Sequence, residues 1–547
     1  MTRSVDRMTQ PDERMTWPLR VLVVGYGPVG ARFVENVLPA VATGAMQLTV
    51  VGAETDDAYN RVLVAEYAVG RTQRDSLTIA DRAAAEAAGA RIVTGVSVRH
   101  LDRETRTATL STGERVPYDR VVLATGSRAN TPTLAGVPRP KRDPATLSSL
   151  PGELIAGDDV LPSGVTALRD LADAERVRQA IAGGRRLVIL GAGVLGLELA
   201  LAAVHAGARV AVVHHGAYPM PRSLDRGGGG VLRQALRRTG LAVFAHSAAE
   251  SVEFRTDDGG ERHFDRLITA DGNQIEGDLL VLSCGVSPRA ELAALSGLRT
   301  AFGVLVDRGL RSWSDPDIYA IGDCAHIVEQ LPEDASARVP GGPSGLIGPG
   351  WRQADWLAAR MRDELDGAAV PASAGMDAER QPLVMLKAEH VDVVAVGDVS
   401  LEPGDEDPRP GRDRAVAVWA DPEHLRYVKM VSEGGVLTGF VCVGMPRTAA
   451  ELTLLFERGA ELPADRSLLL RFDGPDYVAG DDGDAFAPTA TVCWCNAVTV
   501  ERVEESAAQG NETVACIGRD TRAGTGCGGC KTRIADVLAR HAATAAA

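Results

Sequence analysis

Two glycine-rich turns of the same form constrain the fold of this chain more than any other feature. One spans residues 25–30 (GYGPVG) after the apolar run 21–24, and the other spans residues 191–196 (GAGVLG) after the apolar run 187–190. In such a strand–turn–helix, the first glycine makes a tight turn, the second lets the backbone approach a pyrophosphate, and the third lets the helix pack on the strand. The sequence therefore predicts two βαβ units roughly 166 residues apart, each with a dinucleotide site at its glycines. The glycines concerned are Gly25, Gly27 and Gly30 in the first unit and Gly191, Gly193 and Gly196 in the second.

The residues that follow the second strand differ between the two units. In the first unit, the strand at residues 48–51 leads to Glu54, about 24 residues past the last glycine, where an acid can accept a hydrogen bond from a ribose 2′-hydroxyl. In the second unit, the strand at residues 210–213 is followed by His214 and His215, with no acid in the next nine residues. His214 is therefore a candidate contact of a nicotinamide cofactor, and the missing carboxylate slightly favours NADPH over NADH while leaving the choice open. Two nearby cations that we expect to assist are Arg209 and Arg222.

Half of the eight cysteines form one set near the end of the chain. Cys493 and Cys495 make a C-x-C pair, and Cys527 and Cys530 make a C-x-x-C pair after 31 intervening residues. Four thiolates in such a set can hold a [2Fe–2S] cluster. Zinc is the alternative, but it is usually held by C-x₂₋₄-C pairs, so the C-x-C spacing favours the cluster. The sequence therefore predicts that these four cysteines ligate [2Fe–2S].

The remaining cysteines are isolated. We expect Cys284, Cys324 and Cys442 to be core residues, with Cys324 next to Asp323, and we expect Cys516 to be a buried free thiol. No C-x₂₋₄-C pair occurs in residues 1–375, which argues against redox chemistry at a cysteine pair in that part of the chain.

Charge and hydrophobicity exclude several classes of partner. The net charge of −15 disfavours binding to nucleic acid or to anionic membranes. No apolar run approaches the roughly 18 residues of a membrane-spanning helix, and residues 1–20 lack the apolar segment of a secretory signal. We therefore expect a cytoplasmic protein with no nucleic-acid or membrane partner and a disordered lead-in over residues 1–19.

Two further segments give the first 375 residues a resemblance to a known class of enzymes. Ala124-Thr125-Gly126-Ser127 follows the apolar run 121–123, and Ile321-Gly322-Asp323 follows a short apolar strand at 318–320. With the two glycine turns, these segments resemble the two-dinucleotide-fold flavoprotein reductases, such as rubredoxin and ferredoxin reductases. The resemblance implies that the first unit binds FAD and that the inserted second unit binds NAD(P)H. It also implies FAD contacts at Ala124, Thr125, Gly126, Gly322 and Asp323, and a supporting catalytic role for Glu198 near the flavin–nicotinamide contact.

Other segments resemble a narrower family. Tyr59-Asn60-Arg61 and residues 220–225 (MPRSLD) are similar to the FAD half of assimilatory NAD(P)H nitrite reductase large subunits, which adds Arg61 to the implied FAD-binding residues. The cysteine set, preceded by residues 523–526 (AGTG), is similar to the same subunits and to bacterioferritin-associated ferredoxin. Those subunits continue into a sirohaem and [4Fe–4S] domain, and we expect this chain, which ends at Ala547, to lack a site for nitrite reduction.

The fold class predicted from these segments is α/β. It comprises two Rossmann-like dinucleotide-binding folds of the FAD/NAD(P)-linked reductase type, a small α+β domain and a small C-terminal iron–sulfur domain. β-type runs at residues 391–396, 415–419, 427–431 and 439–443 indicate that the small domain is β-rich, and a buried strand is expected at 281–282. The expected boundaries are 20–165 for the first part of the FAD-binding fold, 166–287 for the NAD(P)H-binding fold, 288–375 for the second part of the FAD-binding fold, 380–470 for the β-rich domain, 471–488 for a linker and 489–541 for the [2Fe–2S] domain.

This layout leads to a hypothesis of electron transfer. NAD(P)H on the second fold reduces FAD on the first, and electrons then pass singly to the [2Fe–2S] cluster and to a separate acceptor protein. The resemblance implies nitrogen assimilation, a molybdenum nitrate reductase catalytic subunit as the acceptor, and a homodimer formed through the β-rich domain. The alternatives are a general ferredoxin or rubredoxin reductase, an electron donor to a separate nitrite-reducing chain, and a redox-sensing scaffold.

Overall fold

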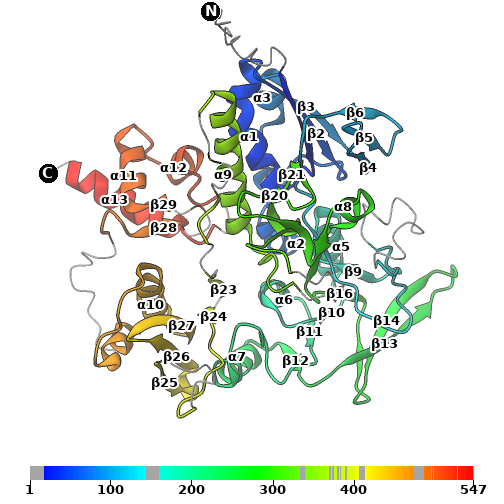
Figure 1. Ribbon diagram of the computed structural model, residues 1–547. Coiled ribbons are helices and arrows are strands. Elements are labelled where there is room, and N and C mark those ends of the chain that lie inside the picture. Colours follow the sequence, from blue (N-terminus) through cyan, green and yellow to red (C-terminus); the bar gives the residue numbers. More distant parts are fainter. Residues whose placement is uncertain are drawn as a thin grey trace, which may run out of the picture.

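The computed structural model shows an α/β chain with its elements in the order expected for two nucleotide-binding folds followed by two smaller domains (Figure 1). It describes residues 18–142, 159–332, 339–368, 371, 375–378, 381, 383–388, 391–405, 413–473, 486–493, 496, 498–525 and 528–545. Among the helices of these residues, none combines the length and the apolar composition needed to span a bilayer.

The first fold is built on a nine-stranded sheet whose centre is parallel. Its strands are β1 (Leu19–Val24), β2 (Met46–Gly52), β3 (Arg91–Thr94), β7 (Arg120–Leu123), β18 (Thr300–Ala301), β19 (Gly303–Val306), β20 (Arg311–Ser312), β21 (Asp315–Ala320) and β22 (Ala325–Ile327). In the central order β21-β7-β1-β2-β3, Val24 lies opposite both Val51 and Leu123. Parallel strands covered on both faces are rich in aliphatic residues, which is why the sequence revealed them. The predicted strands confirmed here are those at residues 21–24, 48–51, 121–123 and 318–320.

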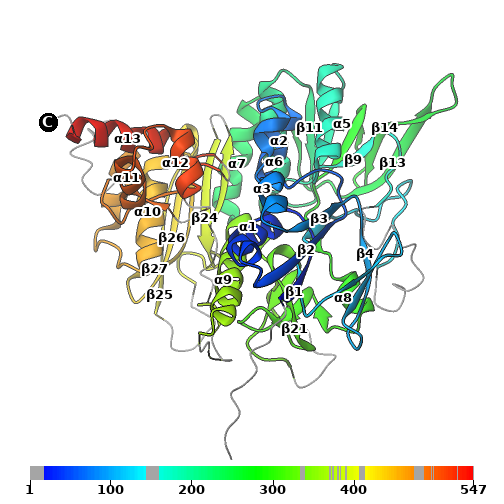
Figure 2. The same ribbon diagram turned by 90° about the horizontal axis from the view of Figure 1, so that it is seen from above.

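Two long helices pack together beside this sheet. Helix α1 (Pro28–Ala42) follows the first glycine turn, and α9 (Ile347–Leu365) lies along it in both ribbon views (Figures 1 and 2). Phe33 and Val37, one turn apart on α1, share a buried core with Leu357 of α9. The smaller elements around the sheet are β4 (Val98–Asp102), β5 (Thr107–Leu110), β6 (Arg115–Pro117), η1 (Arg61–Leu63), α2 (Val64–Ala68), η2 (Arg74–Leu77), α3 (Arg82–Ala87), α8 (Glu291–Leu295) and η4 (Gly322–Cys324).

The second fold is a five-stranded parallel sheet with the order β12-β11-β10-β16-β9. Its strands are β9 (Val165–Ala167), β10 (Leu187–Leu190), β11 (Val210–Val213), β12 (Ala242–Phe244) and β16 (Leu279–Leu282), and its helices are α5 (Leu171–Ala182), α6 (Val194–His205) and α7 (Arg226–Arg238). An antiparallel sheet of β13 (Ala249–Thr256), β14 (Arg262–Thr269) and β15 (Gln274–Glu276) extends from it. Strands β8 (Ser127–Ala129) and β17 (Val286–Pro288) pair where the chain enters and leaves the second fold. The predicted strands at 187–190, 210–213 and 281–282 are confirmed.

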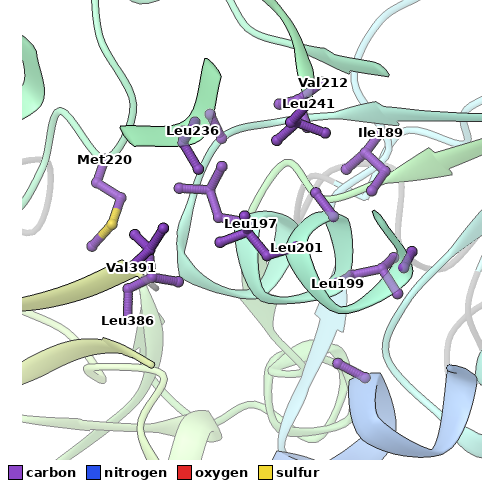
Figure 3. Packing of buried hydrophobic residues seen from close by; sticks show 14 of the residues in the cluster. Ile189, Leu197, Leu199, Leu201, Val212, Met220, Leu236, Leu241, Leu386 and Val391 are labelled. Atoms are coloured by element: carbon purple, nitrogen blue, oxygen red, sulfur yellow. The ribbon is translucent and has the colours of Figure 1, made fainter. Parts of the chain in front are cut away.

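The β-rich domain is an antiparallel sheet that buries both faces. Its order is β23 (Val384–Ala388), β24 (Val391–Gly397), β27 (Val436–Val443), β26 (Arg426–Glu433), β25 (Arg414–Asp421), and it is followed by α10 (Pro446–Arg458) and η6 (Arg466–Asp473). Alternate residues of a strand point to opposite faces. Val428 and Met430 therefore pack toward α10, whereas Val431 joins the core of the second fold. Figure 3 shows this shared core, where Leu386 and Val391 lie near Met220. Because η6 continues through Asp473, the first residues of the predicted linker 471–488 lie in the folded domain, and residues 474–485 lie outside the described residues.

A glycine run lets helix α7 approach this sheet closely. A Cβ on Gly227 would lie 2.6 Å from the ring of Tyr427, so a larger side chain would push the sheet away. The Tyr427 hydroxyl donates a hydrogen bond of 2.5 Å to Asp225, which also caps α7 by accepting from the backbone N–H of Gly228. The fully buried ammonium of Lys429 lies 3.4 Å from the same carboxylate. The β-rich domain is thus fixed to the second fold by glycine packing and a buried ion pair.

The C-terminal part of the chain, here called the cysteine domain, is small and mainly helical. It comprises β28 (Thr491–Cys493), β29 (Val498–Thr499), α11 (Val500–Ala508), α12 (Val514–Thr521) and α13 (Lys531–Ala545). Val500, Val503, Ile517 and Ile534 form a core of its own, separate from the cores of the other domains. The domain, orange to red in Figure 1, lies on the side of the first fold where α1 and α9 run.

Candidate functional site

The first glycine turn has the geometry of a phosphate cradle. Gly25 has a φ of +110°, and a Cβ there would lie 2.2 Å from the carbonyl oxygen of Ala124. A Cβ on Gly30 would lie 2.2 Å from the oxygen of Gly25. Gly27 precedes the first turn of α1 with no side-chain cap, and the nearest atom to a Cβ on it would be Nε of Arg61, at 3.9 Å. The backbone at Gly27 therefore faces open space at a helix N-terminus, which suits a pyrophosphate.

Glu54 and Arg61 come together next to this turn. The Glu54 carboxylate forms a short ion pair with Arg61 and accepts a hydrogen bond of 2.8 Å from the hydroxyl of Tyr59. Burial raises the pKa of Glu54, but the Arg61 charge and these hydrogen bonds outweigh it and hold the pKa below the usual value. Glu54 is thus a carboxylate that can accept from a ribose hydroxyl.

The two segments that carried the family resemblance also meet. Asp323 accepts hydrogen bonds from the Ser127 hydroxyl at 2.6 Å and from Arg169 at 2.9 Å. The Thr125 hydroxyl donates to the carbonyl oxygen of Arg289 at 2.7 Å. Because β7 and β21 are parallel neighbours, their carboxyl ends bring Ala124, Thr125, Gly126, Gly322 and Asp323 to one edge of the sheet, beside Gly25.

Two arginines at this edge, Arg169 and Arg289, were not predicted from the sequence. Arg61 donates a hydrogen bond to the carbonyl oxygen of Arg169, and the charges of Arg61 and Arg289 both act on Arg169. Burial lowers the pKa of Arg169, the Asp323 charge opposes this, and the Arg61 charge adds to it. Three guanidinium groups thus lie among the carboxylates at this edge, which are those of Glu54, Asp170 and Asp323. Arginine side chains suit the recognition of a pyrophosphate because they donate paired hydrogen bonds to phosphate oxygens. No spacing signal marks Arg169 or Arg289, which are single arginines in unrelated segments.

The second glycine turn repeats the geometry of the first. Gly191 has a φ of +118°, and a Cβ there would lie 2.1 Å from the carbonyl oxygen of Ser283. A Cβ on Gly196 would lie 2.5 Å from the oxygen of Gly191. Gly193 precedes α6 with no side-chain cap, and nothing among the described residues lies within 4 Å of a Cβ built on it. This turn also presents a helix N-terminus to a phosphate.

Beside the second turn, strand β11 leads to a histidine whose ring is neutral. His214 is buried at the end of β11, and its Nε2 has no hydrogen-bond partner in the described part of the chain. Burial, together with the charges of His215, His246 and Arg233, lowers the pKa of His214 to about 4, so the ring is neutral at pH 7.

The expectation that Arg209 assists this site is wrong. Arg209 precedes β11 at its amino end, and its guanidinium lies 3.5 Å from the carbonyl oxygen of Gly184, away from the carboxyl edge where nucleotides bind. Arg222 is exposed in the loop between β11 and α7, and the N–H of nearby Met220 donates to the carbonyl oxygen of Ala192 in the second glycine turn.

Glu198 lies half-buried on α6, in the turn that follows Gly196. Helix α6 packs against α2, which follows η1, the short helix that begins with Arg61. Glu198 is thus on the helix that joins the two nucleotide folds, and its catalytic role stays a prediction.

Two of the four predicted cluster ligands lie side by side. Cys493 and Cys530 are both buried, and a hydrogen bond with Cys530 lowers the pKa of Cys493 to about 6. Burial opposes this shift, and the backbone N–H groups of Gly524 and Asn496 support it. Iron is bound by the thiolate, and a lowered pKa favours that form. This donor pair therefore fits a [2Fe–2S] cluster. Cys495 and Cys527 lie outside the described residues.

Among the isolated cysteines, Cys324 and Cys442 are buried as expected, whereas Cys284 is only partly buried against the edge of a core cluster. Cys324 is fully buried, and its thiol donates to the carbonyl oxygen of Leu123 at 3.3 Å. Cys284 donates likewise to the carbonyl oxygen of Leu190, and burial raises the pKa of its thiol to about 11. The expectation of a buried thiol at Cys516 is wrong, because this residue is partly exposed in the first turn of α12, with its sulfur 3.0 Å from the guanidinium of Arg519.

Comparison with known proteins identifies both halves of this arrangement. Residues 19–339 match the family described as pyridine nucleotide-disulphide oxidoreductase, and residues 491–540 match the BFD-like [2Fe-2S] binding domain. The nitrite reductase [NAD(P)H] of Bacillus subtilis (strain 168) is 26% identical over 95% of this chain and 57% of its own length. The assimilatory nitrate reductase electron transfer subunit of the same organism is 25% identical over 95% of this chain and 59% of its own length. The chain thus spans less than two thirds of either relative.

Solved structures support the fold. The covalent putidaredoxin reductase–putidaredoxin complex matches with a TM-score of 0.63 and 22% identity, over 83% of this chain and 96% of that chain. The ferredoxin reductase for the CYP199A2 system from Rhodopseudomonas palustris matches with a TM-score of 0.60 and 24% identity, over 83% and 100%. The chain therefore belongs to the pyridine nucleotide-disulphide oxidoreductase family, as an oxidoreductase that uses NAD(P)H and FAD and carries a BFD-like [2Fe–2S] domain.

Proposed function

We propose that this protein passes electrons from NAD(P)H, by way of FAD and the [2Fe–2S] cluster, to a separate acceptor, the molybdenum-containing catalytic subunit of an assimilatory nitrate reductase. The observation that carries the proposal is the buried pair Cys493 and Cys530 in the same chain as two nucleotide folds. A reductase fold that carries its own single-electron centre suits delivery to a one-electron acceptor.

The first fold holds FAD in this proposal. The backbone at Gly25, Gly27 and Gly30 receives the pyrophosphate. Arg61, Arg169 and Arg289 balance its charge, and Glu54 accepts a hydrogen bond from the ribose. FAD supplies the capacity to accept two electrons together and to release them singly. Asp323, held by Ser127 and Arg169, orients the remaining polar groups at this edge.

The second fold holds NAD(P)H at Gly191, Gly193 and Gly196. His214 places a neutral ring where NADH-selective proteins carry an acid, so both NADPH and NADH are accepted. Glu198, on the helix between the two folds, supports the nicotinamide near the flavin.

The choice of acceptor rests on the relative named as an assimilatory nitrate reductase electron transfer subunit, which aligns with 95% of this chain. A protein in this role works in the cytoplasm, and a homodimer is consistent with it. The nitrite reductase relative, matched to the same extent, supports a second candidate, in which the acceptor is a separate nitrite-reducing chain.

Reconstitution tests the proposal. The protein is mixed with its cognate nitrate reductase catalytic subunit, and formation of nitrite from nitrate is measured with NADH and with NADPH. We expect nitrate reduction by the wild type, and loss of it in Cys530→Ser, which keeps electron transfer from NAD(P)H to ferricyanide. Ferricyanide reduction without nitrate reduction would overturn the choice of acceptor, and activity with the nitrite-reducing chain would establish the second candidate.

A further inference from the structure

The cysteine domain touches the first fold through the loops that carry its cluster ligands. Arg32 on α1 donates a hydrogen bond of 2.8 Å to the side-chain oxygen of Asn496, the residue after Cys495. Asn60 donates a hydrogen bond of 2.6 Å to the carbonyl oxygen of Thr525, two residues before Cys527. Both cysteine pairs are therefore next to residues bound by the first fold.

The two side chains of the first fold that contact the cysteine domain, Arg32 and Asn60, are also held by partners within the first fold. The guanidinium of Arg32 forms two hydrogen bonds to Asp355, of 2.6 and 2.5 Å, and lies 5.2 Å above the ring of Trp351. Asn60 is almost fully buried, and its side-chain oxygen accepts from the backbone N–H of Val62 at 3.0 Å. A donor that is fixed in this way loses little freedom on binding, which favours one docking geometry.

On each side of this contact, the residues that form it lie next to a proposed cofactor site. On the first fold, Arg32 lies on the helix that begins at the glycine turn, and Asn60 directly precedes Arg61. On the cysteine domain, the Asn496 amide nitrogen lies 3.8 Å from the sulfur of Cys493 and donates to the carbonyl oxygen of Arg522 at 2.8 Å. A short polar path thus runs from the flavin-binding helix to a cluster ligand.

An ion pair borders this contact. Glu35 on α1, whose side chain is 58% exposed, pairs with Arg522 at 2.7 Å. The two domains keep separate hydrophobic cores, so the described contacts between them that involve these residues are polar. Polar contacts of this kind give orientation and rate more than affinity.

We propose that Arg32, Glu35 and Asn60 form an intramolecular docking site that holds the cluster loops against the flavin site, and that these are positioning residues for electron transfer into the cluster. This inference rests on the proposed function. Oxidation of one NAD(P)H to NAD(P)⁺ releases two electrons and one proton. Two single-electron transfers across the contact, each passed on to the acceptor protein, balance one turnover.

A charge swap tests the docking site in the full chain loaded with both cofactors. Glu35→Arg places two cations together, and we expect cluster reduction after mixing with NADPH to slow about tenfold while flavin bleaching keeps its rate. The double variant Glu35→Arg with Arg522→Glu should restore the rate. Freeze-quench EPR follows the cluster, and stopped-flow absorbance follows the flavin.

A second variant addresses the buried contact. Asn60→Asp keeps the acceptor for Val62 but replaces the donor to Thr525 with an oxygen, and we again expect slower cluster reduction. Asn511→Asp is the matched control, because Asn511 bonds to Ser506 within the cysteine domain. Hydrogen–deuterium exchange of residues 28–42 and 514–525 gives a readout independent of activity and should increase in Glu35→Arg and Asn60→Asp only.

The outcomes separate this inference from the proposed function. A wild-type cluster that NADPH and NADH never reduce would overturn the proposed function, whereas exchange would still report docking. A wild-type cluster that is reduced, with unchanged rates and exchange in Glu35→Arg and Asn60→Asp, would overturn the docking site alone.

Discussion

The two dinucleotide folds share one turn and differ in what surrounds it. Gly25 and Gly191 have φ values of +110° and +118°, and a Cβ on either would meet, at 2.2 or 2.1 Å, the carbonyl oxygen of the residue that follows a neighbouring strand. Beside the first turn, arginines and carboxylates form a charged network, whereas beside the second the buried His214 is neutral. If both turns bind phosphate, as we propose, the difference must come from their neighbours. The network suits a resident FAD, and the neutral site suits a nicotinamide that comes and goes.

The largest expected effect comes from closing each turn separately. Gly25→Ala places a Cβ against the neighbouring backbone at a φ that costs about 1–3 kcal/mol by itself, so FAD content should fall by more than about tenfold. Gly191→Ala should keep FAD and lose reduction by NAD(P)H. Flavin absorbance of the purified variants and stopped-flow bleaching measure the two effects. Equal FAD loss in both variants would contradict the assignment of the folds.

The charged network predicts the next largest effect. Arg169→Ala leaves Asp323 with the Ser127 hydroxyl and removes one cation from the edge of the sheet. We expect FAD affinity to fall by about 1–3 kcal/mol, because the Asp323 carboxylate loses its charged hydrogen-bond donor. Titration of the apoprotein with FAD, followed by fluorescence quenching, gives the dissociation constant. Arg176→Ala, which removes an exposed arginine nearby, is the control and should bind FAD normally.

A single substitution should make the second fold selective. His214→Glu introduces a carboxylate where a 2′-phosphate is expected, so kcat/KM with NADPH should fall about tenfold relative to that with NADH. Arg209→Ala should leave the ratio unchanged, because Arg209 lies at the other end of β11. An unchanged ratio in His214→Glu would show that the nucleotide ribose lies elsewhere.

The smallest effect is a dependence of stability on pH. The pKa of His214 is about 4 in the folded chain and about 6.5 when unfolded, so only the unfolded state gains a proton between these values. Stability that is present above about pH 6.5 is therefore lost as the pH falls toward 4, by about 1 kcal/mol between pH 7 and pH 5.5. His214→Gln should flatten this part of the profile in guanidinium unfolding. The same decline in His214→Gln and wild type would assign it to another group.

Local patterns were readable from the sequence, and long-range contacts were not. Runs such as residues 187–190 revealed strands because a parallel strand buried on both faces needs aliphatic side chains throughout. The placement of the β-rich sheet on α7 depends on Gly227 fitting the ring of Tyr427, some 200 residues away, and no periodicity encodes that fit. Arg209 was misjudged because proximity in sequence to His214 hid their location at opposite ends of one strand.

The site shows the same division. The glycine turns and the cysteine set could be read as motifs, because backbone geometry and ligand spacing require particular residue types. Arg169 and Arg289 could not, since only long-range contacts with Asp323 and Thr125 bring them to this edge of the sheet. The contacts of Asn60 and Arg32 with the cysteine domain were equally hidden.

An anaerobic titration of the purified protein with NADPH, and separately with NADH, would decide whether the chain is an electron conduit. Visible spectra would follow the flavin, and low-temperature EPR would follow the cluster. We expect the flavin to bleach and the signal of a reduced [2Fe–2S] cluster then to appear. Flavin bleaching without that signal, together with zinc in metal analysis, would contradict it.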